Sequence, residues 1–100
     1  MDLYASFETE HGRRYLQTLC KHFGRKNPVR FDAQTGFIEL PFGSCALEVS
    51  GSRLNLSVSA ETKPDLDRAT QAITSHLERF AFRENPDLKW NPMKVETQNA

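Results

Sequence analysis

The segment LQTLCKHFGRK, residues 16–26, places Cys20 two positions before His22, with basic residues following both. A thiolate and an imidazole can together bind a metal ion or act as nucleophile and base. On a helix, however, side chains two positions apart point about 200° away from each other. We therefore expect Cys20 to pack in the core as a small hydrophobic residue. His22 is expected at the edge of the same helix, and the pair alone predicts no site.

The segment SHLERFAFRE, residues 75–84, carries a second group of chemically capable side chains. His76, Arg79 and Arg83 are about one turn apart, so they line one flank of a predicted helix. If this helix lies beside the helix of His22, the two imidazoles face each other. Two imidazoles and a carboxylate could hold a divalent metal ion, and this set would be His22, His76 and Glu84. Guanidinium groups match carboxylate and phosphate, and that anion-binding set would be His22, His76, Arg79 and Arg83.

A third interpretation of these arginines stays open, because exposed arginines often form weak surface ion pairs with neighbouring carboxylates. The sequence offers little other chemistry. All five glycines fall at predicted turns or helix ends, and the patterns GxGxxG, GxxxxGK[ST], GxSxG and HExxH are absent. The candidate chemistry therefore depends on how the two helices are placed.

Hydrophobic periodicity predicts the elements that position these side chains. Apolar residues between Leu16 and Phe23 recur at helical spacing, and Gly24 is placed to end that helix. Thr62 begins a second helix with the pattern of a capping box. The short segments between the helices alternate apolar and polar residues, as half-buried strands do. We expect helices at 10–24 and 62–83 and strands at 3–9, 29–31, 37–42, 45–49 and 53–60.

The fold follows from the need to bury one apolar face of the sheet. Short connections favour an antiparallel meander, and two amphipathic helices are available to cover it. We predict an α+β two-layer sandwich of order β-α-β-β-β-β-α, with an antiparallel sheet of about five strands and two helices on one face. Residues 1–90 would form a single domain, with Leu88 and Trp90 as a brief last strand or a cover. Residues 91–100 would form a disordered tail.

Composition narrows the classes of function. Thirteen basic residues balance thirteen acidic ones, so no general polyanion-binding surface and no nucleic-acid partner are expected. No apolar run approaches the roughly 20 residues that cross a bilayer, and the N-terminal residues do not resemble a secretion signal. The two cysteines are not in a CxxC pattern. We therefore expect reduced thiols and a cytoplasmic protein without a membrane partner, with one disulfide between Cys20 and Cys45 as the open alternative.

Several segments resemble one bacterial family. RRYLQTLCKHFGRK at 13–26, HLERFAFRE at 76–84 and LKW at 88–90 are similar to the small proteins of domain-of-unknown-function family 2218. The resemblance extends from Leu3 to Trp90. It implies no catalytic residue, because the family has no established activity. Similar domains occur joined to flavin-dependent, siderophore-interacting reductases, which implies a link to iron handling and a reductase as a partner.

The leading hypothesis is a non-enzymatic or accessory module that binds a small anionic ligand, a metal chelate or a protein partner. The alternative is a metal-dependent enzyme that uses His22, His76 and a carboxylate. A structural alternative is a homodimer formed through Tyr4 and Phe37, which are expected on the outer face of the sheet. The sequence identifies no cofactor. The two site hypotheses require both helices on one face, with the imidazoles within about 12 Å of each other.

Overall fold

A computed structural model of the chain describes residues 1–84 and 88–92. The helices and strands follow the predicted order. They are β1 (Asp2–Glu8), α1 (Gly12–Phe23), β2 (Val29–Phe31), β3 (Thr35–Leu40), β4 (Gly43–Ser50), β5 (Arg53–Ser59), α2 (Lys63–Phe80) and the short 3-10 helix η1 (Phe82–Glu84).

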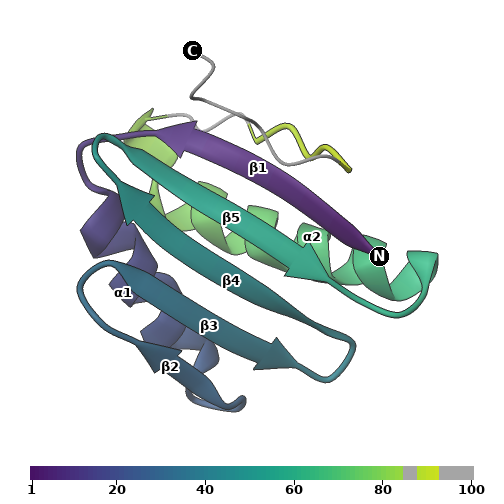
Figure 1. The fold of residues 1–100 in the computed structure, drawn as a ribbon. Helices are drawn as coiled ribbons and strands as arrows, with labels where there is room; N and C mark the ends of the chain where they lie inside the picture. Colours follow the sequence, from purple (N-terminus) through teal and green to yellow (C-terminus); the bar gives the residue numbers. More distant parts are fainter. Residues whose placement is uncertain (85–87, 93–100) are drawn as a thin grey trace.

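The five strands form one antiparallel sheet in the order β1-β5-β4-β3-β2. Both helices lie on the same face of this sheet (Figure 1). The predicted α+β two-layer sandwich is confirmed. The first strand thus pairs with the last, and β2 forms the opposite edge.

The core lies between the sheet and the two helices because each element turns its apolar residues to the same layer. Alternate residues of the strands and one stripe of each helix are buried there. The largest fully buried side chains are those of Leu16, Leu19, Ile38, Leu54, Ile73, Leu77 and Val58. A sheet with one apolar face and two amphipathic helices therefore accounts for the architecture.

The ends of the helices have local causes. The hydroxyl of Thr9 accepts a hydrogen bond from the backbone of His11 at 2.9 Å, and α1 begins only at Gly12 rather than at residue 10. Thr62 caps α2 by accepting the backbone N–H of Asp65, as the sequence predicts. The second helix ends at Phe80 rather than at 83, and η1 follows it.

The described part of the C-terminal segment packs on the domain. Leu88 and Trp90 contact the core, and the Trp90 indole N–H donates to the Thr74 hydroxyl at 2.9 Å. Asn91 was expected in the tail, but it pairs with Tyr4 through two backbone hydrogen bonds of 2.7 and 2.8 Å. The rest of the predicted tail, from residue 93, lies outside the described residues. Within the described ranges, neither helix has the length and apolar character needed to span a bilayer.

Candidate functional site

Two imidazole rings meet where α1 and α2 pack together. His22 lies in the last turn of α1, His76 lies on α2, and both side chains are half-buried. Their ring centroids are 4.6 Å apart, with the ring planes inclined by 47°. The geometric condition set by the sequence analysis is therefore met, because both helices cover one face and the rings touch.

Phenyl rings surround the two imidazoles. The ring centroid of Phe23 is 4.7 Å from that of His76, and the centroid of Phe80 is 5.7 Å from that of His22. These apolar neighbours restrict the access of water to the ring faces. The four rings form a compact aromatic group at the edge of the helix pair.

The orientation of His76 is fixed by its own helix. Its Nδ1 lies 2.7 Å from the carbonyl oxygen of Ala72, one turn earlier. A carbonyl oxygen can only accept, so Nδ1 carries the hydrogen and donates it. In the neutral ring the other nitrogen, Nε2, therefore keeps a lone pair for a proton or a metal ion.

Two guanidinium groups act on His22. The pKa of His22 is lowered, first by burial and then by the charges of His76, Arg25 and Arg79. Both arginine side chains are exposed, and in the described part of the chain neither forms an ion pair with a carboxylate. The interpretation of Arg79 as a surface ion-pair residue thus finds no partner among these residues.

Arg25 was not among the predicted site residues. It lies just beyond Gly24, where α1 ends, and its backbone N–H bonds the carbonyl of His22 at 3.4 Å. Helical periodicity predicts the face on which a side chain lies only within the helix, so it gave no position for Arg25. The signal in the sequence was that Arg25 follows His22 by only three residues.

The remaining predicted site residues lie in η1, beyond the end of α2. The Arg83 side chain is exposed, and its charge is not among the causes of the lowered pKa of His22. The Glu84 carboxylate accepts a hydrogen bond from the Tyr15 hydroxyl at 2.5 Å and another from the Thr9 hydroxyl at 3.0 Å. These bonds hold Glu84 beside the beginning of α1, about two turns from His22.

The structure therefore does not gather His22, His76 and Glu84 into one metal site. Across residues 1–84 and 88–92, no three His, Cys, Asp or Glu side chains form a group that could hold a metal ion. Glu84 was named as a carboxylate that could join the two imidazoles, but its carboxylate accepts the hydrogen bond of the buried Tyr15 hydroxyl.

The cysteines belong to the core. Cys20 and Cys45 are free and fully buried. Burial raises the pKa of Cys20 to about 11 and that of Cys45 further. At neutral pH both are thiols, not thiolates, and neither is activated as a nucleophile or metal ligand. The expected packing of Cys20 is confirmed.

The outer face of the sheet carries the two predicted aromatic residues. Strand register places Ser57 and Ala46 between Tyr4 and Phe37 in one row across the sheet. A hollow of about 470 Å³ lies over the small side chains, and the Arg30 guanidinium stacks on the Phe37 ring at 5.4 Å.

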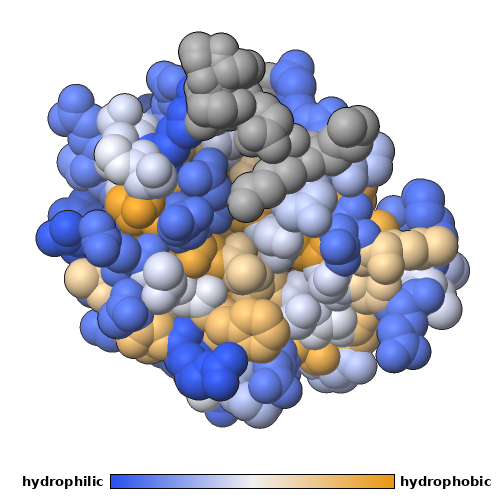
Figure 2. Space-filling view, viewed as in Figure 1, coloured by the Kyte–Doolittle hydropathy of each residue, from blue (hydrophilic) through white to orange (hydrophobic). Residues whose placement is uncertain are grey.

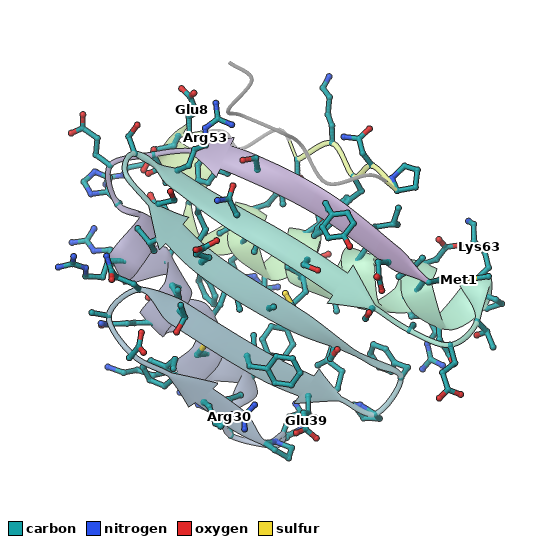
Figure 3. The ribbon with its side chains drawn as sticks, viewed as in Figure 1. Met1, Glu8, Arg30, Glu39, Arg53 and Lys63 are labelled. Carbon is teal, nitrogen blue, oxygen red and sulfur yellow. The ribbon has the colours of Figure 1, made fainter. Side chains whose placement is uncertain are left out.

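Charged residues surround the middle of this outer face. Figure 2 shows several hydrophobic residues near its centre, next to less hydrophobic ones, with strongly hydrophilic residues toward the rim. The Arg53–Glu8 ion pair, 3.0 Å long, lies at one corner of the sheet, and Arg30 and Glu39 lie at the opposite side (Figure 3). The middle of the face is therefore less polar than its margins.

Comparison with known proteins places the chain in a family. Residues 4–91 match the family described as "Uncharacterized protein conserved in bacteria (DUF2218)". The chain belongs to this family. The resemblance of the segments around His22 and His76 is thereby confirmed.

A solved structure has the same fold as this DUF2218 protein. It is titled "NMR structure of PA4090 from Pseudomonas aeruginosa" and aligns with a TM-score of 0.77 at 26% identity. The alignment covers 94% of this chain and 98% of that chain. No curated protein matches the sequence. These comparisons give the family and the fold, and the site geometry is the basis for a function.

Proposed function

We propose that this DUF2218 protein is a binding module that takes a small anionic ligand at the edge of the α1–α2 contact. The observation that supports this function is the pair of imidazoles at 4.6 Å beside two guanidinium groups without a carboxylate partner in the described residues. The ligand-binding residues would be His22, His76, Arg25 and Arg79. Arg83 was assigned to the same set from sequence, and its contribution remains a prediction.

The chemistry of each group fits an anion with carboxylate or phosphate oxygens. Guanidinium groups donate paired hydrogen bonds to such oxygens and keep their charge at all physiological pH values. The imidazoles are half-buried among phenyl rings, so a ligand contact there is partly shielded from water. Electrostatic attraction is stronger where water is excluded.

The experiment is a titration of ¹⁵N-labelled protein with inorganic phosphate and with citrate at neutral pH. Resonances of His22, His76 and the neighbouring turn should shift. Arg79→Ala and Arg25→Ala should each weaken binding about two- to fivefold, the range expected for an exposed charge contact. Arg13→Ala is the matched control, because this arginine is also exposed but lies in the first turn of α1.

The stability of the variants separates a binding effect from a folding effect. Both arginine side chains are exposed, so their truncation should change the free energy of unfolding by less than about 0.5 kcal/mol. An unchanged affinity of Arg79→Ala and Arg25→Ala, or an equal loss in Arg13→Ala, would refute the proposal.

The metal-dependent enzyme remains a separate prediction, without support from the position of Glu84. It is tested by elemental analysis of protein purified without a histidine tag. Stoichiometric metal would favour it, and its absence together with no thermal shift on adding zinc or iron(II) would count against it.

The predicted partners and location also remain predictions. A homodimer through the outer sheet face would be converted to a monomer by Phe37→Glu, which light scattering would detect. The reductase partner and the link to iron handling follow from the resemblance of similar domains, and the anion-binding proposal does not depend on them. The cytoplasmic location also remains a prediction.

A further inference from the structure

We propose that the anion recognised at this site is a chelated transition-metal ion, bound through both its metal and its chelator. His22 and His76 would each give one ring nitrogen to the metal ion, displacing two water molecules. Arg25 and Arg79 would bind carboxylate oxygens of the chelator. This inference rests on the proposed function, because it specifies the class of ligand for the same four residues.

The spacing of the imidazoles suits one shared ion. A metal–nitrogen bond is about 2.0–2.1 Å long, and a ring nitrogen lies about 1 Å from its own centroid. Two imidazoles on one ion at roughly right angles therefore have centroids about 4.5 Å apart, and about 5 Å apart at a tetrahedral angle. The observed centroid separation of 4.6 Å agrees with these values.

The hydrogen bond of His76 also suits a metal ligand. Histidines that bind metals usually donate their other ring N–H to a carbonyl or carboxylate, which fixes the ring and its tautomer. Here Nδ1 donates to the Ala72 carbonyl at 2.7 Å. This bond leaves Nε2 as the nitrogen that binds the ion.

The lone pair and the positive charges beside the two rings together favour a metal chelate over a bare anion or a bare metal ion. His76 donates its Nδ1–H to the Ala72 carbonyl, so Nε2 of the neutral ring points no hydrogen at a ligand and offers a lone pair. A bare anion could use the guanidinium groups and a ring N–H, but it would leave this lone pair unused. A bare divalent cation would be repelled by Arg25 and Arg79. A metal ion inside an anionic chelator satisfies both the lone pairs and the guanidinium groups.

The number of possible metal ligands on the protein also favours a chelated metal ion. No third His, Cys, Asp or Glu joins the two imidazoles within the ranges 1–84 and 88–92. First-row transition metals that accept imidazole need further donor atoms. A chelator that leaves two neighbouring positions open would supply those donors itself.

Nickel(II)–nitrilotriacetate is a suitable probe, because it carries one net negative charge and leaves two neighbouring coordination positions open. Its binding to untagged protein is measured by calorimetry at neutral pH, in parallel with free nickel(II). His22→Gln and His76→Gln should each lower the affinity for the chelate at least tenfold. His11→Gln is the matched control, because His11 is the remaining histidine and is exposed at the start of α1.

The arginine variants give a test of opposite signs. Arg79→Ala and Arg25→Ala should each weaken binding of the anionic chelate about two- to fivefold. The same variants should leave binding of free nickel(II) unchanged or make it stronger. A nonspecific histidine surface would respond equally to both probes. Circular dichroism of each variant confirms that the fold is retained.

Several results would overturn this inference. They are a chelate affinity that is unchanged in His22→Gln, an equal loss in His11→Gln, or arginine variants that affect both probes alike. If the chelate fails to bind while phosphate or citrate binds with the predicted arginine dependence, this inference falls and the proposed function stands. If neither kind of probe binds, both fall.

Discussion

Replacing Tyr15 with Phe removes one hydroxyl and tests how η1 is attached to the domain. This hydroxyl donates to the Glu84 carboxylate at 2.5 Å, joining positions that are 69 residues apart. The Tyr15 ring is buried and stacks on Phe7 with 6.0 Å between centroids. The substitution keeps these ring contacts, so the measured effect belongs to the hydrogen bond.

The expected loss can be estimated from the contact. A hydrogen bond to an ionised group contributes about 1.5–3 kcal/mol. Glu84 is half-buried and keeps the bond from Thr9, so the lower end applies and we expect a loss of about 1–2 kcal/mol. For a chain of 100 residues this corresponds to a decrease in Tm of about 5–10 °C. Thermal and urea unfolding at pH 7 measure it.

The pH dependence gives a second check. The Tyr15 hydrogen bond is the main cause that lowers the pKa of Glu84 below its ordinary 4.5. A carboxyl group with a lowered folded pKa stabilises the fold above its unfolded pKa, and this contribution disappears as pH falls through the folded pKa. The difference between wild type and Tyr15→Phe should therefore be full at pH 7 and smaller near pH 3.

Tyr4→Phe provides the matched control. Its hydroxyl makes only a long contact of 3.4 Å with the exposed Asp2 carboxylate, so its loss should cost less than about 0.5 kcal/mol. If Tyr15→Phe is as stable as Tyr4→Phe, or if its deficit is the same at pH 3 and pH 7, the assignment of this bond is refuted.

Three further predictions concern the core, the imidazole pair and the C-terminal cover. A Cβ at Gly36 would lie 2.8 Å from Sγ of Cys20, so Gly36→Ala should cost about 1–3 kcal/mol in urea unfolding. Adding Cys20→Ala should recover part of this loss. If the losses of stability in the two single variants simply add in the double variant, the predicted clash between the new Cβ and Cys20 is wrong. The pKa of His22 is lowered from 6.5, so the unfolded chain binds a proton at a higher pH than the folded chain does. The free energy of unfolding should therefore fall as pH drops from 7 to 5.5. This fall should be smaller in His22→Gln. Trp90→Phe should lower the free energy of unfolding by about 1 kcal/mol, because the hydrogen bond to Thr74 is lost. A double-mutant cycle with Thr74→Val should show that the two losses are not additive.

The fold was predictable because short-range periodicity determines which face of each element is apolar. The alternation of β5, from Arg53 to Ser59, appears in the structure as alternating burial. The pairing of Asn91 with Tyr4 was not predicted, because it joins segments far apart in the chain through backbone groups. Periodicity carries no information about such contacts.

The meeting of His22 and His76 was predictable from helix geometry, since both positions lie on the flank of an apolar stripe. The position of Glu84 was not predictable from helix flanks. A signal for it existed, because the hydroxyl of a buried tyrosine normally finds a hydrogen-bond partner. Tyr15 is such a residue, and the acceptor of its hydroxyl is the Glu84 carboxylate.

The zero net charge of the whole chain is compatible with a local group of positive charges at the edge of the α1–α2 contact. Arg25 and Arg79 add positive charge beside an imidazole whose own pKa is lowered, and within the described residues no carboxylate balances them. Among the described residues, Arg53, Lys63 and Arg68 form ion pairs with carboxylates, so Arg25 and Arg79 differ from other exposed cations through their place beside the imidazoles. Departures from local rules are expected at functional sites, where a ligand compensates them. For this reason the helix edge, rather than the buried thiols or the outer sheet face, is the place where binding should be sought first.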